Sequence, residues 1–110
     1  MSKPRSLFNS IYAAVGSIPV GMVASYGQIS NFVGRCSPLM VGYALAALPF
    51  DSDVPWHRVV NRKGYISPRG DGDASEVQRA LLEAEGVCFN KSGGIDMASN
   101  QWHFPDTDPI

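Results

Sequence analysis

The first part of the chain repeats hydrophobic positions with the spacing of an amphipathic helix. Apolar residues recur every three or four positions, which predicts a helix over residues 5–16. Gly16 and the segment 18–21, which contains a proline and a glycine, end this predicted helix. The apolar residues that follow the spacing are Leu7, Phe8, Ile11, Tyr12 and Val15.

Two further short helices are predicted immediately downstream. Ser25 and Gln28 match a capping box, in which each side chain bonds the backbone N–H of the other residue. The box predicts a helix over residues 26–33. Ser37-Pro38 supplies the next N-cap and first helical position, and the Ala- and Leu-rich run 39–48 continues that helix. Two short helices with a tight, glycine-containing connection are typical of a helix-turn-helix.

The chain beyond Pro49 predicts short strands. Residues 54–60 are β-prone, residues 61–64 have turn composition, and residues 65–67 predict a returning strand. Residues 87–89 and 95–97 flank a glycine-containing turn over residues 90–94, a pattern that predicts a second hairpin.

One more helix separates these two hairpins. Asp73 and Glu76 match a second capping box, and the hydrophobic spacing continues to residues 85–86, where a glycine is suited to end the helix. Residues 107–110 are expected to fray. The pattern as a whole predicts one domain over residues 1–110 that is mainly α with small β hairpins.

The charge of the chain is divided unevenly along its 110 residues. The formal net charge is −1, which by itself argues against a nucleic-acid partner. Residues 1–70, however, hold seven Lys or Arg against two Asp, a net +5, whereas residues 71–110 hold two against eight, a net −6. This asymmetry predicts a basic face and an acidic face.

The two cysteines, Cys36 and Cys88, are far apart and indicate reduced thiols in a protein that is not secreted. We expect it in the cytoplasm if the source is a prokaryote and in the nucleus if it is a eukaryote. No stretch approaches the roughly 18 apolar residues of a membrane span, so no membrane partner is expected. The His, Cys and Asp residues lack the ligand spacing of zinc or calcium sites, and neither a metal nor a cofactor is predicted.

Residues 54–64 combine side chains that rarely occur together. The segment places a tryptophan, a histidine and three cations in a predicted strand and turn. One interpretation is a core strand with a solvated basic turn. The other is an aromatic platform flanked by phosphate-binding cations, because stacking of a base on an aromatic ring contributes about 1–3 kcal/mol. The residue types alone leave both interpretations open.

The same segment resembles the motif of a known family. Residues 55–60, Pro-Trp-His-Arg-Val-Val, are similar to the Pro-Cys-His-Arg-Val motif of the O6-alkylguanine-DNA alkyltransferases, with Trp56 where their reactive cysteine stands. Tryptophan at this position is the hallmark of the alkyltransferase-like proteins. The resemblance covers about residues 6–104. The other segments that match, in the same order, are 18–29, 41–45 and 82–87.

The resemblance implies a winged helix-turn-helix-like fold, as in the C-terminal domain of the alkyltransferases, and damage recognition without repair chemistry. Proteins of this kind bind double-stranded DNA through its minor groove and flip an O6-alkylguanine into a pocket. They then present the lesion to nucleotide excision repair proteins. Alkyl transfer needs a thiolate, which an indole cannot replace, so a non-enzymatic protein is expected. The protein is also expected to be a monomer.

The resemblance also assigns individual residues. His57 and Glu85 match the pair that activates the cysteine in the enzymes, and we expect them to persist here as a structural hydrogen-bonded pair. The expected alkylated-base pocket is lined by Trp56 together with Tyr26, Arg69, Pro49, Val54, Pro55 and Ser67. The residues expected to contact DNA are Ser25, Tyr26, Gln28, Arg35, Leu39, Met40, Gly42, Tyr43 and Arg62.

Neither cysteine is expected to restore alkyl transfer. Cys36 follows Arg35, which would lower the pKa of its thiol, but it falls in the turn between two predicted helices. Cys88 falls in an apolar predicted strand and is expected to be buried and inert.

Leu39 departs from the family pattern. An arginine at this position acts in the family as a finger that enters the duplex and fills the space left by the flipped base. A leucine can wedge between base steps but adds no charge. An alternative function is therefore a protein-interaction module on the same fold with weak or lost DNA binding, and its candidate surface is the acidic part, residues 71–110.

Overall fold

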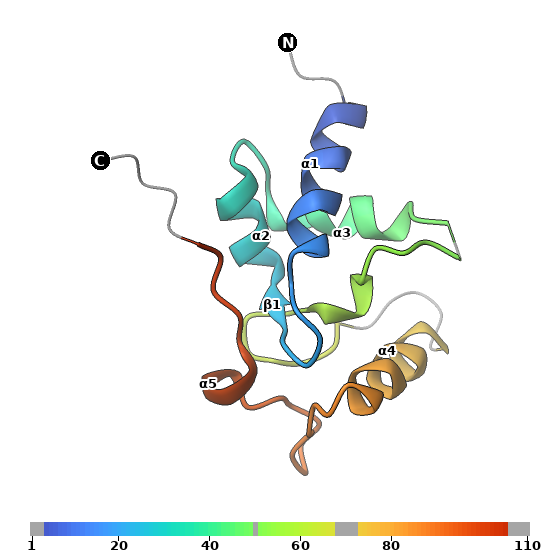
Figure 1. Ribbon diagram of the computed structural model, residues 1–110, viewed down its shortest axis with the longest axis vertical. Coiled ribbons are helices and arrows are strands. Elements are labelled where there is room, and N and C mark those ends of the chain that lie inside the picture. Colours follow the sequence, from blue (N-terminus) through green and yellow to red (C-terminus); the bar gives the residue numbers. More distant parts are fainter. Residues whose placement is uncertain (1–3, 50, 68–72, 106–110) are drawn as a thin grey trace.

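The computed structural model describes residues 4–49, 51–67 and 73–105, which form mainly helices and one small sheet (Figure 1). Within these ranges no helix has the length and apolar character needed to cross a membrane. The helices are α1 (Pro4–Gly16), α2 (Tyr26–Val33), α3 (Pro38–Ala46), α4 (Asp73–Ala84), α5 (Met97–Asn100) and the 3-10 turn η1 (Trp56–Arg58). The strands are β1 (Ala24–Ser25) and β2 (Val59–Val60).

Helices α1, α2 and α3 pack around one hydrophobic core. Burial of each larger aliphatic side chain in it contributes about 1.5–3 kcal/mol. The hydroxyl of Tyr12 donates to the carbonyl oxygen of Ala44 at 2.7 Å and ties α1 to α3. The residues at the centre of this core, which are fully buried, include Ile11, Val15, Ile29, Val41 and Ala44.

Helices α2 and α3 begin at the caps that the sequence predicts. The Ser25 hydroxyl accepts from the N–H of Gln28 at 3.1 Å, and the Ser25 N–H donates to Oε1 of Gln28 at 2.9 Å. The Ser37 hydroxyl accepts from the N–H of Met40 at 3.1 Å. The predicted pair of short, capped helices is therefore confirmed.

The small sheet differs from the predicted hairpin. Strands β1 and β2 run parallel, with Ala24 opposite Val59. The predicted strand over residues 54–60 is wrong except for its last two residues, because Trp56–Arg58 form η1. Residues 65–67 lie outside any strand. The partner of β2 lies far upstream in the chain, and an alternation of residue types within a segment cannot reveal such a pairing.

The end of the described chain forms an isolated bridge and a short helix. A single antiparallel bridge joins Phe89 to Ile95, so the predicted hairpin over residues 87–97 is present only in reduced form. Met97 begins α5 instead of ending a strand, because the Asp96 carboxylate caps that helix by accepting from the N–H of Ala98 at 3.1 Å.

Helix α4 packs over a second, smaller core that contains Leu82. Its Gln78 side chain is 1% exposed and donates to the carbonyl oxygen of Val59 at 2.8 Å, which fastens the helix to β2. Gly86 follows the helix with φ +94°, as expected of a glycine that ends one. The predicted capping side chain of Asp73 and the tail at 107–110 lie outside the part of the chain whose side chains are described.

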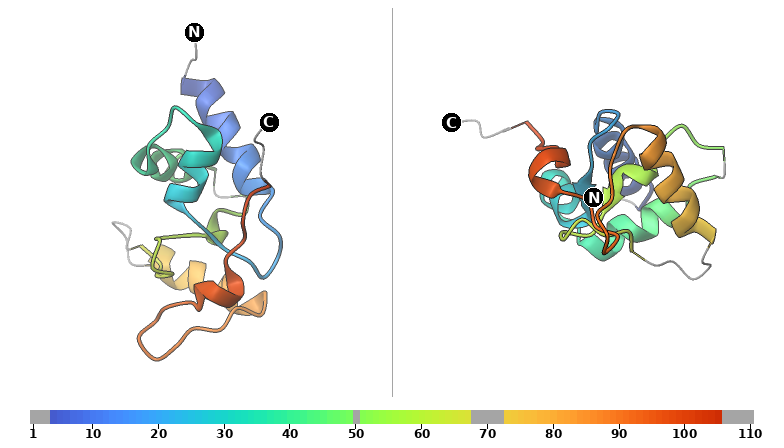
Figure 2. Two further views of the ribbon diagram at one scale, coloured as in Figure 1. Left: turned by 90° about the vertical axis from the view of Figure 1, so that its left-hand side faces the viewer. Right: turned by 90° about the horizontal axis from the view of Figure 1, so that it is seen from below.

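The elements fall into two parts joined by η1 and β2. Helices α1–α3 form the upper part of Figure 1 and α4 and α5 the lower part. In the left view of Figure 2, α3 and the yellow-green segment 61–67 lie on one side, and the blue segment 17–22 lies on the other. The two sides differ in the kinds of side chain that they expose.

Candidate functional site

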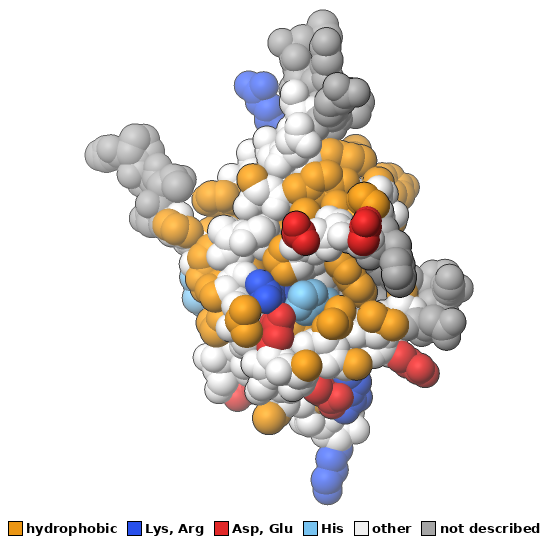
Figure 3. All heavy atoms as spheres, turned by 45° about the vertical axis from the view of Figure 1, so that its right-hand side comes forward, with side chains coloured by type: hydrophobic (Ala, Val, Ile, Leu, Met, Phe, Trp, Pro, Cys, Tyr) orange, Lys and Arg blue, Asp and Glu red, His pale blue; other side chains and the backbone are white. Residues whose placement is uncertain are grey.

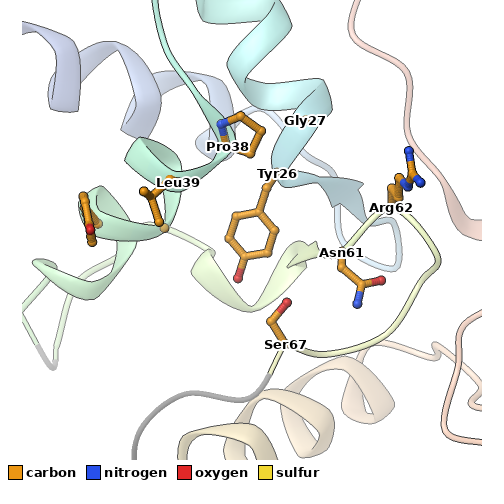
Figure 4. A pocket seen from close by; sticks show the side chains of 9 residues that line it. Tyr26, Gly27, Pro38, Leu39, Asn61, Arg62 and Ser67 are labelled. Carbon is orange, nitrogen blue, oxygen red and sulfur yellow. The ribbon is translucent and has the colours of Figure 1, made fainter.

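A groove of about 740 Å³ opens between the start of α2, the start of α3 and the segment that follows β2 (Figure 4). The side chains of its walls are mostly apolar. The residues that line it are Tyr26, Gly27, Pro38, Leu39, Gly42, Tyr43, Asn61, Arg62 and Ser67. The structure thus gathers in one place six of the residues that the resemblance assigns to the base pocket or to DNA contact: Tyr26, Leu39, Gly42, Tyr43, Arg62 and Ser67.

Tyr26 projects into the middle of this groove (Figure 4). It is the first residue of α2 and directly follows the Ser25 cap, so the capping box sets the position of its backbone. A Cβ atom added at Gly42 would lie 4.0 Å from Cε2 of Tyr26, an ordinary van der Waals contact, so α3 passes close to the ring. The Tyr26 ring therefore has a defined position between α2 and α3.

Leu39 and Tyr43 give the α3 wall an exposed apolar surface. They lie one helical turn apart, and 64% and 57% of their surfaces are exposed. Arg62 is the one cation among the described residues of the groove, and Figure 4 shows it on the wall opposite Leu39. Contact with a partner at this groove would therefore depend mainly on stacking and apolar packing.

Three lining residues were absent from the sequence-based site. Gly27 and Pro38 neighbour predicted site residues, and Pro38 is predicted only as the start of a helix. Asn61 is predicted only as part of a turn, and it does hold that turn: its Oδ1 accepts from the N–H groups of Lys63 and Tyr65 at 3.0 Å each. Its place after β2, which brings it to the groove, depends on the long-range pairing with β1.

Four residues expected in the base pocket do not line this groove: Pro49, Val54, Pro55 and Trp56. Trp56 lies in η1 and packs against the main core, with its ring edge-to-face with that of His57 at a centroid distance of 6.1 Å. Arg69 lies outside the described residues. The role of these five residues in a base pocket stays a prediction.

Of the other residues expected to contact DNA, Gln28 and Ser25 form hydrogen bonds within the chain. Gln28 donates from Nε2 to the carbonyl oxygen of Trp102 at 2.8 Å and accepts at Oε1 from Nε2 of Gln101 at 2.7 Å. Ser25 is only 5% exposed. Arg35 is exposed in the connection between α2 and α3, where its backbone has φ 53°. The remaining residue of this group, Met40, packs partly against the main core.

His57 and Glu85 lie in hydrogen-bond contact at the junction of η1, α4 and the segment after α1. Their Nε2 and Oε2 atoms are 2.7 Å apart, and their side chains are 12% and 14% exposed. Arg58 joins them through bonds from Nε at 3.0 Å and Nη2 at 2.7 Å to the two carboxylate oxygens. The third arm of this guanidinium, Nη1, donates to the carbonyl oxygen of Ile18 at 2.8 Å.

This network determines the charge of Glu85. Burial alone would raise the pKa of its carboxyl, but hydrogen bonds from Arg58, His57 and the N–H of Gly21 outweigh burial and lower the pKa to about 2. Glu85 is therefore a carboxylate at any physiological pH. Sequence reasoning predicted the contact with His57 but missed Arg58, which it counted among cations available to a ligand.

The two thiols differ from expectation in both cases. Burial raises the pKa of the Cys36 thiol, so the predicted lowering by Arg35 is wrong. Cys88 is exposed, so its predicted burial is also wrong, because residues 87–89 form only one bridge and no sheet covers them. Neither cysteine lines the groove.

Comparison with known proteins places the fold in a family. The model of the family described as "6-O-methylguanine DNA methyltransferase, DNA binding domain" matches residues 6–87. The chain is 41% identical over 105 residues to the DNA base-flipping protein of Escherichia coli, covering 94% of this chain and 80% of that one. It is 42% identical over 81 residues to alkyltransferase-like protein 1 of Schizosaccharomyces pombe, covering 73% and 75%.

Solved structures agree with this placement. The crystal structure of S. pombe Atl1 with damaged DNA containing O6-carboxymethylguanine matches with a TM-score of 0.83 and 33% identity over 94% of this chain and all of that one. Mycobacterium tuberculosis OGT in complex with DNA matches with a TM-score of 0.62 and 34% identity over 71% of this chain and 48% of that one.

The chain belongs to the family of the 6-O-methylguanine DNA methyltransferase DNA-binding domain and, within it, to the alkyltransferase-like proteins. Its mainly helical fold with a small sheet is the winged helix-turn-helix-like fold that the sequence predicts.

Proposed function

We propose that this protein recognises O6-alkylguanine in double-stranded DNA, by binding the minor groove and turning the damaged base out of the duplex, without repairing it. The observation that carries the proposal is the position of the Tyr26 side chain in an apolar groove between the two capped helices. An aromatic ring there can contact a nucleotide as it leaves the stack, and a damaged guanine leaves more readily because its pairing is already weak.

The relatives support this assignment. One is named a DNA base-flipping protein, and the structure most similar in shape among those compared above holds damaged DNA with an O6-alkylated guanine. The apolar groove suits a partner whose recognition depends on stacking more than on charge. Trp56, Arg69, Pro49, Val54 and Pro55 complete the proposed base pocket, with Trp56 beside the alkyl group.

The absence of alkyl transfer is also part of the proposal. Transfer requires a thiolate near the base. Trp56 occupies the position of the reactive cysteine in the resembling motif, Cys36 has a raised pKa, and Cys88 lies in a segment that does not line the groove. Incubation with duplex containing O6-methylguanine should therefore add no mass to the intact protein, and a gain of one methyl group on either cysteine would contradict the proposal.

The fate of the lesion follows from the same reasoning. A protein that holds an altered base without altering it must pass the lesion to another system, and we assign that role to nucleotide excision repair proteins. The protein acts as a monomer in this scheme, because the groove is complete within one chain.

A paired binding titration tests recognition directly. Two duplexes of identical sequence, one with a single O6-methylguanine, are titrated by fluorescence anisotropy at low and at moderate salt. We expect tighter binding to the damaged duplex at both salt concentrations, because the preference comes from the groove and not from phosphate contacts. Equal affinity for the two duplexes would contradict the proposed function.

A further inference from the structure

A second apolar surface lies away from the groove. Val77 and Leu81 on α4 are 50% and 38% exposed, and they are one helical turn apart on the same side of the helix. The neighbouring side of α4, about 100° round the helix axis, carries Gln78 and Leu82, which are buried. Val77 and Leu81 therefore do not belong to the buried core that holds this helix.

Val20 extends this surface beyond α4. It is 66% exposed and precedes Gly21, whose N–H donates to Oε1 of Glu85 at 3.1 Å. Glu85 lies one turn after Leu81, so the segment after α1 is fastened beside the end of the apolar row. Figure 3 shows hydrophobic side chains on this face around a histidine, a cation and an acidic group. Val20, Val77 and Leu81 are called the α4 patch below.

The α4 patch and the groove face different directions. In the left view of Figure 2, the segment that contains Val20 lies on the side opposite α3 and residues 61–67, which line the groove. A ligand in the groove would therefore leave the patch accessible.

The surroundings of the α4 patch are acidic. Asp51 and Asp53 are exposed in the loop before η1 and Glu76 is exposed on α4, whereas Glu83 is paired with Arg79 at 3.2 Å and adds no net charge. Figure 3 shows acidic side chains on both sides of the hydrophobic ones. Such a surface repels the phosphates of DNA and attracts cations, while the apolar residues at its centre favour contact with other apolar side chains.

We propose that the α4 patch is a docking surface for a protein segment that carries apolar side chains flanked by Lys or Arg. The acidic rim attracts and orients that segment, and Val20, Val77 and Leu81 are covered on binding. The inference does not require the proposed DNA specificity, and it places the protein-contact surface on one side of α4 together with Val20, which lies outside the acidic part of the chain.

The test uses amphipathic helical peptides as probes of the surface. The full chain, labelled with ¹⁵N and free of DNA, is titrated with a leucine–lysine peptide, with a serine–lysine peptide of equal charge, and with a leucine–glutamate peptide. We expect the leucine–lysine peptide to bind most tightly and to shift the amide signals of Val20, Val77 and Leu81. The double variant Val77→Ser/Leu81→Ser should weaken this binding by about tenfold, and Ala80→Ser, which changes an exposed position on the outer face of α4, should leave it unchanged.

The other outcomes overturn the inference. Equal binding of the serine–lysine peptide would mean that charge alone acts, and equal binding of the leucine–glutamate peptide would mean that the acidic rim is irrelevant. Shifts confined to Tyr26, Leu39 and Tyr43 would assign peptide binding to the groove. The damaged-DNA titration is separate, so a protein that binds the peptide at the patch but does not prefer damaged duplex would refute only the proposed function.

Discussion

The groove and the junction around Glu85 adjoin the two ends of the same short segment, η1 and β2, and they use opposite kinds of side chain. The groove exposes Leu39 and Tyr43 and holds Tyr26 between two helices. The junction instead interlocks His57, Arg58 and Glu85 in side chains that are only 12–14% exposed. In this protein, the charged residues of the Pro-Trp-His-Arg segment hold the fold, while aromatic and aliphatic residues form the candidate recognition surface.

The difference changes how the charge of the chain is understood. Arg58 contributes to the net +5 of residues 1–70, yet its guanidinium is bonded to Glu85 and to the carbonyl oxygen of Ile18. It is therefore unavailable to phosphates. Arg62 remains at the groove, and Arg35 remains exposed in the connection between α2 and α3. Among the residues whose side chains are described, Arg35, Arg62 and Lys63 remain as cations of the basic part, and non-specific DNA binding is expected to be weak because few of its charges can contact phosphates.

The largest effect is expected from breaking the junction with Glu85→Gln. The pKa of Glu85 is about 2 in the fold against an ordinary value of 4.5, so its ionisation stabilises the folded state at pH above about 4.5. The shift corresponds to about 3 kcal/mol, which is lost as the pH falls towards 2. Urea unfolding should be measured from pH 7 to pH 2. At pH 7 the variant should have a much lower free energy of unfolding than the wild type, and the two values should converge at the acidic end.

Glu83→Gln is the matched control for that series. Glu83 pairs with Arg79 at 3.2 Å on the same helix, but the two side chains are 51% and 46% exposed. An exposed pair of this kind contributes below about 1 kcal/mol. If the two variants lose equal stability, the junction is no stronger than a surface ion pair, and the contrast between the two regions fails.

The next effect is expected from emptying the groove with Tyr26→Ala. Loss of a stacking ring should weaken binding to duplex with O6-methylguanine by about tenfold to a hundredfold. Tyr26→Phe, which keeps the ring, should retain most of the affinity. Fluorescence anisotropy with the damaged and undamaged duplexes measures both variants, and an unchanged preference in Tyr26→Ala would remove the groove as the recognition site.

Features that depend on neighbouring residues could be predicted from the sequence. The helices beginning at Ser25 and Ser37 follow from capping side chains within three residues of each other, and the structure contains both caps. Tyr26, Leu39 and Tyr43 are carried by these helices, but their assignment to a site came from the family resemblance and not from the caps. The contact of His57 with Glu85 came from the family resemblance and not from spacing.

Features that depend on distant residues could not be predicted in this way. The parallel pairing of Ala24 with Val59 gives β2 its position, and without it Trp56–Arg58 looked like a strand. The inward turn of Arg58 depends on a carboxylate twenty-seven residues away. The C-terminal segment presents the same difficulty, because Gln101 meets Gln28 across seventy-three residues.

A smaller effect is expected from adding a cation to the groove with Leu39→Arg. One additional phosphate contact should tighten DNA binding severalfold at low salt and steepen the dependence of log affinity on log salt by about 0.9. Ala46→Arg, at an exposed position at the far end of α3, is the control for a general increase in charge. If both variants steepen the salt dependence equally, Leu39 does not lie at the DNA.

The smallest effect is expected from loosening the support of the groove with Gln101→Ala. Gln101 donates to Oε1 of Gln28, the same atom that accepts from the N–H of Ser25 beside Tyr26. Removing one hydrogen bond of this kind costs about 0.5–1.5 kcal/mol in stability, and we expect only about a twofold to threefold loss of affinity for damaged duplex. Ser99→Ala, which removes a bond to Asp96 in the same segment, should leave the affinity unchanged. Equal losses in both variants would mean that the segment acts through general stability and not through the seat of Tyr26.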